Sequence, residues 1–111
     1  MPRHIFISFT NANDGKDIEY NSWYRDQHLP EVLSIPGFIS GQRYRLSDCQ
    51  FAGMVSPWKY MAIYQIEGES PAAALAELSR RISGGTITIS DALAPDVAAW
   101  AYSPAGLHDS K

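Results

Sequence analysis

One histidine lies where its side chain could exchange protons with a bound molecule. His28 stands just before the dipeptide Leu29-Pro30, in a stretch crowded with aromatic residues. An imidazole titrates near pH 7, which suits it to work as a general acid or base. The competing interpretation is a partly buried histidine that ties an irregular helix to a sheet. The residues alone leave both roles open for His28.

Two aromatic residues precede this histidine on the predicted helix. Tyr24 lies one turn before His28, so it could orient a substrate oxygen or hydrogen-bond the imidazole. The plainer interpretation makes Tyr24 a core aromatic with its hydroxyl at the rim. Trp23 flanks the same stripe, and its type and position fit packing better than ligand binding.

Further candidates for ligand binding lie on predicted strands. Arg43 and Tyr44 are neighbours, so their side chains point to opposite faces and at most one of them faces a pocket directly. A buried arginine without a partner would be costly, so Arg43 could instead pair with a carboxylate across a subunit interface. Tyr60 and Tyr64 share one strand face, where they line either a cavity or a core or interface stripe.

Other chemistries find little support in the sequence. His4, His28 and His108 are scattered, and none forms a short-spaced ligand pair, so we expect no metal site. Gly84-Gly85 lacks the spacing and the following lysine of a phosphate loop. Cys49 and the serines lack the strained elbow of a nucleophile. The expected chemistry therefore needs no cofactor.

Length and composition limit the class of protein. The 111 residues fit one domain, which we assign to 1–103, with a tail at 104–111. The net charge of −3 lacks the excess of positive charge that is typical of nucleic-acid-binding domains. No apolar run approaches the ~20 residues of a membrane helix, and the run Ile5–Phe9 is too short for a signal peptide. The single Cys49 makes no intrachain disulfide, so we expect a cytoplasmic protein.

Hydrophobic periodicity and punctuating residues predict four strands and two helices. Pro30 lies inside the first helix, where it should kink or rewind the chain near Gln27–Leu29. Pro36-Gly37 ends that helix, and Gly41 marks a bulge or a close backbone approach in the next strand. The predicted elements are a strand at 3–10, a helix at 17–34, a strand at 38–46, a strand at 59–66, a helix at 71–82 and a strand at 97–102.

This order of elements predicts an α+β protein with the ferredoxin-like βαββαβ pattern. In that pattern a four-stranded antiparallel sheet carries both helices on one face. The strands here have large apolar groups on both sides, such as Ile5 beside Phe6 and Tyr60 beside Met61. A bare apolar sheet face is unusual for a monomer. We therefore predict a homodimer in which the open sheet faces pack together.

A motif within residues 20–46 is similar to a known family. The matching residues are Trp23-Tyr24, then His28-Leu29-Pro30-Glu31-Val32-Leu33, then Ile35-Pro36-Gly37-Phe38 and Arg43-Tyr44. They resemble the EthD-like branch of the dimeric α+β barrel superfamily. The resemblance implies a ligand pocket between the helices and the sheet, with His28 pointing toward it. It implies no single reaction, because the superfamily includes cofactor-free monooxygenases, muconolactone-type isomerases, polyketide cyclases and dehydratases, and proteins without assigned chemistry.

With this resemblance we favour an enzyme. The predicted function is cofactor-free acid/base chemistry, of the isomerase, dehydratase or cyclase type, on a small and largely apolar cyclic or aromatic oxygenated metabolite. The predicted catalytic residues are His28 and Tyr24, and the predicted substrate-binding residues are Trp23, Arg43, Tyr44 and Tyr64. Some dimeric α+β barrels bind haem, so the resemblance also allows haem ligation by His28, which we do not favour. The alternatives are a cofactor-independent monooxygenase and a non-catalytic small-molecule-binding accessory protein of a catabolic or polyketide pathway.

Overall fold

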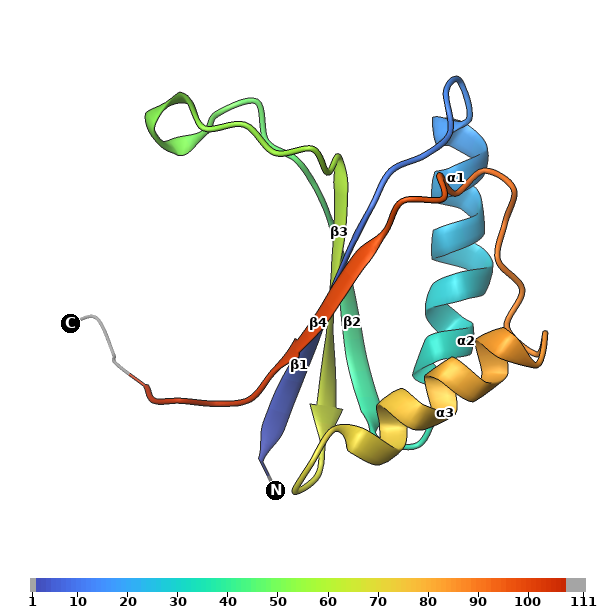
Figure 1. Cartoon of the computed structure of the whole chain (residues 1–111), viewed down its shortest axis with the longest axis vertical. Helices are drawn as coiled ribbons and strands as arrows, with labels where there is room; N and C mark the ends of the chain where they lie inside the picture. Colours follow the sequence, from blue (N-terminus) through green and yellow to red (C-terminus); the bar gives the residue numbers. More distant parts are fainter. Residues whose placement is uncertain (1, 108–111) are drawn as a thin grey trace.

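The computed structural model describes residues 2–107 and shows one sheet with the helices on one side of it (Figure 1). The elements are β1 (Arg3–Thr10), α1 (Asp17–Trp23), a π-helical turn (Tyr24–His28), α2 (Leu29–Leu33), β2 (Phe38–Arg45), a short 3-10 turn (Phe51–Gly53), β3 (Tyr60–Glu67), α3 (Ala72–Ser83) and β4 (Ala98–Tyr102). The strands are antiparallel in the order β2-β3-β1-β4. This arrangement confirms the predicted ferredoxin-like α+β fold. Of the predicted tail, residues 104–107 carry no regular structure and the rest, with His108, lies outside the described residues.

The central strand β3 follows the alternation expected from its sequence. Its helix-facing side chains are buried, and they are Tyr60, Ala62, Tyr64 and Ile66. In the pairing with β1, Ser8 lies opposite Ala62 and Thr10 opposite Tyr60. The small hydroxyl side chains of Ser8 and Thr10 therefore lie on the helix side of this strand pair, next to the tyrosines of β3.

Strand β2 departs from regular alternation at its start. Its sequence predicts that one face carries Phe38, Ser40, Gln42, Tyr44 and Leu46, and the assignment of Phe38 to that face is wrong. The pairing register with β3 shifts between Phe38 and Ser40, so a bulge turns Phe38 to the buried helix side while Tyr44 stays on the opposite face. A Cβ at Gly41 would lie 2.9 Å from Leu29 Cδ1, which confirms the predicted close approach at this glycine.

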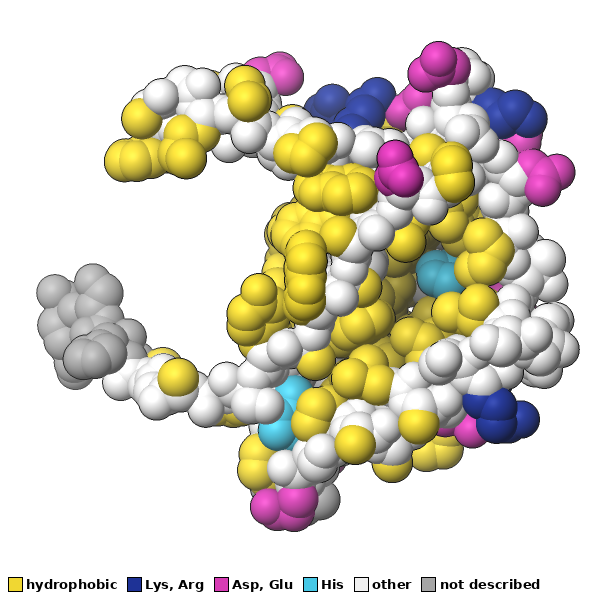
Figure 2. All heavy atoms as spheres, viewed as in Figure 1, with side chains coloured by type: hydrophobic (Ala, Val, Ile, Leu, Met, Phe, Trp, Pro, Cys, Tyr) yellow, Lys and Arg dark blue, Asp and Glu magenta, His cyan; other side chains and the backbone are white. Residues whose placement is uncertain are grey.

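The other face of the sheet carries no element of the described chain (Figure 1). Phe9 forms the middle of an aromatic row on this open face, with ring centroids 6.4 Å from Trp58 and 6.1 Å from Trp100. Trp100 is 53% exposed, and Tyr102 beside it is 55% exposed. Hydrophobic side chains cover this side of the molecule (Figure 2). Among the described residues, no helix has the length and hydropathy needed to cross a membrane.

Candidate functional site

A π-helical turn shapes the helix that carries most of the predicted site residues. The Leu29 N–H donates to the carbonyl of Tyr24, five residues back instead of four. Pro30 follows, and its ring and missing N–H disfavour a regular turn at this point. The wider turn brings residues five apart onto one side, so the ring of His28 stacks on Trp23, with centroids 4.6 Å apart and 26° between the planes. The irregularity predicted from the proline thus creates the surroundings of the histidine.

A cavity lies beside His28, between the helices and the sheet. Its volume is about 160 Å³. Apolar side chains from both layers form most of its wall. The lining residues are Phe6, Ser8, Thr10, Trp23, Tyr24, His28, Val32, Tyr64, Leu78, Ile82, Ile89, Leu93, Val97, Ala98 and Ala99. Because an apolar protein cavity of ~150 Å³ accepts benzene, this one can hold a single six-membered ring.

The imidazole of His28 is held in an apolar environment. The rings of Tyr24 and His28 are nearly perpendicular, with an interplanar angle of 80° and a centroid distance of 4.8 Å. The Nδ1 atom is buried, with no hydrogen-bond partner among the described residues. Burial lowers the pKa of His28 from its ordinary value of 6.5 to about 4. At neutral pH the ring is therefore uncharged and can accept a proton.

Three hydroxyl groups form a row in the wall of the cavity. The Ser8 Oγ lies 3.2 Å from the Tyr24 hydroxyl, which lies 2.7 Å from the Tyr64 hydroxyl. Burial raises the pKa of both tyrosines above the ordinary value, so both stay protonated at neutral pH. Three hydroxyls carry three hydrogens, and two of these are used within the row. The third is free to bind an oxygen atom of a ligand.

A segment between α3 and β4, residues 84–97, covers part of the cavity; we call it the strap. It supplies Ile89, Leu93 and Val97 to the lining. The backbone of Asn13 donates to the Ala92 carbonyl at 2.8 Å, which fixes one part of the strap. The Trp23 indole N–H donates to a strap carbonyl, that of Thr88, at 3.2 Å. Trp23 thus contacts both His28 and the strap that covers the cavity. 

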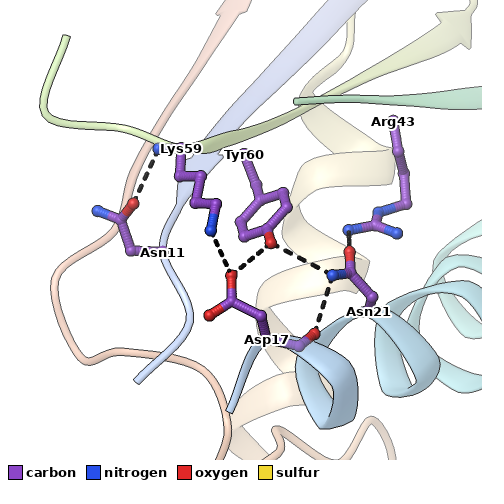
Figure 3. Close-up of polar contacts among 6 residues, drawn as sticks. All are labelled: Asn11, Asp17, Asn21, Arg43, Lys59 and Tyr60. Atoms are coloured by element: carbon purple, nitrogen blue, oxygen red, sulfur yellow. Dashed lines mark hydrogen bonds and ion pairs between the residues drawn. The ribbon is translucent and has the colours of Figure 1, made fainter. Parts of the chain in front are cut away.

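Two predicted ligand-binding residues lie outside the cavity. Arg43 and Tyr44 line a separate polar groove at the edge strand β2. The Arg43 Nη2 donates to the Asn21 Oδ1 at 2.7 Å (Figure 3). The Arg43 guanidinium also lies 4.7 Å from the centroid of the Tyr24 ring. The sequence predicts either a ligand or a carboxylate of a partner subunit as the partner of Arg43. Within the described chain, Arg43 instead contacts the amide of Asn21 and aromatic rings.

A polar network joins α1 to the sheet next to this groove (Figure 3). The Tyr60 hydroxyl donates to the Asp17 carboxylate at 2.5 Å, and Lys59 Nζ donates to the same oxygen at 2.8 Å. These hydrogen bonds, first that of Lys59 and then that of Tyr60, hold the pKa of Asp17 below its ordinary value. The network fixes the start of the helix, and its residues are not part of the cavity wall.

The cavity gathers four of the six predicted site residues: Trp23, Tyr24, His28 and Tyr64. Sequence reasoning missed Ser8. A signal was available, because Ser8 interrupts the apolar run Ile5–Phe9 and strand alternation puts it on the same face as Phe6. Sequence reasoning also gave no role to Glu31, one turn beyond His28. Like the Nδ1 atom of His28, the Oε1 atom of Glu31 is buried and has no hydrogen-bond partner in the described chain.

Comparison with known proteins identifies the fold. No family model matches the chain, and no curated protein matches its sequence. Among solved structures, At3g17210 from Arabidopsis thaliana is 15% identical with a TM-score of 0.65, and the match covers 97% of this chain and 99% of that one. An EthD-like protein from Ralstonia eutropha is 15% identical with a TM-score of 0.54, covering 90% and 92% of the two chains. The chain shares the fold of the EthD-like proteins.

A third solved structure with this fold contains a ligand. It is a monooxygenase from the gene ActVA-Orf6 of Streptomyces coelicolor, in complex with Nanaomycin D. It is 14% identical, with a TM-score of 0.53, and the match covers 99% of this chain and 93% of that one. At these identities the shared feature is the fold, and the chemistry of each chain depends on its own residues.

Proposed function

We propose that this protein is a cofactor-free acid/base enzyme that removes a proton next to a carbonyl or from a phenol. The observation that carries the proposal is the pairing, in one cavity, of an uncharged imidazole with a row of protonated hydroxyls. His28 accepts the proton. The free hydrogen of the Ser8–Tyr24–Tyr64 row binds the oxygen on which negative charge develops.

The strength of the base limits the substrate. A conjugate acid with a pKa of about 4 makes His28 a weak base. Each unit of mismatch with the substrate's pKa adds about 1.4 kcal/mol to proton transfer. The enzyme therefore acts on an acidified position, such as a carbon between two carbonyl groups or an aromatic hydroxyl. Reprotonation elsewhere gives an isomer, loss of a hydroxyl gives dehydration, and attack on a second carbonyl gives cyclisation.

The size and polarity of the cavity limit the substrate further. A volume of about 160 Å³ accommodates one ring behind the strap. Its wall is mostly apolar, and its polar groups include His28 and the hydroxyl row. We therefore propose a cyclic or aromatic oxygenated metabolite whose reacting oxygen points to the hydroxyl row.

The test uses a small panel of cyclic 1,3-diketones and polyhydroxylated aromatic compounds. The wild type should catalyse exchange of the acidic hydrogen for deuterium, followed by NMR, and H28Q should lose this activity while still binding the compound. Y60F is the matched control, because Tyr60 contacts the polar network and is not in the cavity wall. Full exchange activity in H28Q would refute the assignment of His28 as the base.

Two other functions use the same cavity. The ActVA-Orf6 structure supports a cofactor-independent monooxygenase, in which the carbanion formed by proton removal reacts with O2. Oxygen uptake that depends on His28 would distinguish this reaction. A non-catalytic accessory protein would bind the ligands with equal affinity in the wild type and in H28Q, without turnover in either.

We also propose that the protein works as a homodimer in the cytoplasm. The open sheet face supports the dimer, because it presents the aromatic row of Phe9, Trp58 and Trp100 to solvent. Large aromatic side chains dominate the binding energy of many interfaces. Sedimentation equilibrium at micromolar concentration should give twice the mass of one chain. The W100S substitution should lower this average mass toward that of a monomer. A wild-type protein that sediments as a monomer would refute the dimer.

A further inference from the structure

The connection between β2 and β3 projects from the molecule as an arm, residues 46–58. In Figure 1 this arm and the chain after β4 both leave the sheet on the side away from the helices. The space-filling view shows a hollow between them, with hydrophobic side chains on its floor (Figure 2). The radius of gyration is 15.1 Å, whereas a compact domain of this length measures ~13 Å. The chain is therefore less compact than a typical domain of this length, and the hollow is open to a partner.

The root of the arm is fixed to the sheet. The Leu46 N–H donates to the Lys59 carbonyl at 2.7 Å, which continues the strand pairing into the arm. The Asn11 side chain holds the returning strand, because its Nδ2 donates to the Pro57 carbonyl and its Oδ1 accepts from the Lys59 N–H (Figure 3). The direction of the arm is therefore set by the sheet.

The tip of the arm is apolar and has no partner in the described chain. Phe51 is 84% exposed, Met54 is 65% exposed and Val55 is 95% exposed. The hydrogen bonds of residues 47–56 within the described chain stay inside the arm; for example, the Met54 N–H donates to the Phe51 carbonyl at 3.0 Å. Three large apolar side chains held in solvent on a fixed arm indicate a docking surface.

We propose that the arm clasps a second copy of this chain seated on the open sheet face. This inference rests on the open-face dimer proposed above. A partner that covers the face must enter the hollow between the arm and the chain after β4, so its edge lies against the apolar tip (Figure 2). In a two-fold dimer each arm then reaches around the other protomer, and both tips are buried by the same contact.

The charge of the arm argues against other partners. Asp48 is its single charged residue, so the arm contains no lysine or arginine. Nucleic acid and anionic lipid surfaces are bound mainly through such basic side chains. The apolar tip continues the apolar open face instead, which fits a protein surface of the same composition, and a second copy provides one.

The first experiment uses the chain's own single cysteine. Cys49 lies in the arm and is exposed. The wild type is labelled there in dilute solution with a maleimide benzophenone, concentrated, and irradiated as an equal mixture of 14N and 15N protein. The clasp predicts crosslinked peptide pairs that combine the two isotopes. Crosslinks found only within one isotope-labelled chain would overturn it.

The second experiment measures the dimer dissociation constant by sedimentation equilibrium. F51S/V55S should raise this constant roughly 10,000-fold, since the two substitutions on each of the two protomers remove four buried side chains, each worth at least a factor of ~10. I18S is the matched control, because Ile18 is 86% exposed on α1, on the helix side of the sheet, and should leave the constant unchanged. A wild-type dimer that F51S/V55S does not weaken refutes the clasp alone. A monomeric wild type refutes the dimer and the clasp together.

Discussion

The buried neutral His28 should make the stability of the protein fall in mild acid. Its pKa is about 4 in the folded chain and 6.5 in the unfolded chain, because burial disfavours the charged ring. As the pH falls below 6.5, the unfolded state binds the proton first, so the free energy of unfolding decreases. The two pKa values differ by about 2.5, and about 1.4 kcal/mol per pKa unit makes the total loss about 3.5 kcal/mol, most of it between pH 6.5 and 4. The loss is complete once the pH lies below about 4.

Denaturant unfolding of the wild type and of H28Q isolates this contribution. Other groups titrate in both proteins, and their effects cancel in the difference between them. Above pH 7 the difference in unfolding free energy should be constant. Between pH 6.5 and 4 the wild type should lose about 3 kcal/mol more than H28Q. Parallel pH profiles would show that the imidazole is solvated and ordinary, which would refute the reasoning from burial.

Three further changes test the packing and the hydroxyl row. Gly41→Ala should destabilise the fold by about 1–3 kcal/mol, because the new Cβ would lie 2.9 Å from Leu29 and 3.0 Å from Tyr64; a thermal melt like that of the wild type would contradict it. Tyr64→Phe should lower kcat for deuterium exchange about 100-fold, as loss of one oxyanion donor does elsewhere, with the far-UV spectrum unchanged; an unaffected kcat would remove Tyr64 from the mechanism. Tyr60→Phe should cost about 1–2 kcal/mol of stability through its lost bond to Asp17, and calorimetry should find ligand affinity unaltered.

Several local features could be predicted because their causes are local. Pro30 predicts a break in helical geometry wherever it lies inside a helix, and the π-helical turn at 24–28 is that break. The alternation of β3 predicts which of its side chains are buried, since a central strand has one register in this sheet. The glycine at 41 predicts a close approach, and Leu29 is the group that comes close.

The register of β2 could not be predicted in this way. Alternation assigns faces correctly only while each residue opposes one residue of the next strand. The bulge between Phe38 and Ser40 adds one residue to β2, and nothing in the apolar pattern marks it. The result is that Phe38 lies in the core with Tyr64, at a ring-centroid distance of 5.8 Å.

The sequence by itself determined the order of elements, the fold class and the residue types available for chemistry. Tertiary structure decided which of them meet. Ser8, Tyr24 and Tyr64 come from β1, the helix and β3, and their hydroxyl row exists only because these elements pack together. The low pKa of His28 has the same origin, since it depends on the surfaces that exclude water from the ring. Local patterns encode neighbours along the chain, whereas burial and electrostatics depend on neighbours in space.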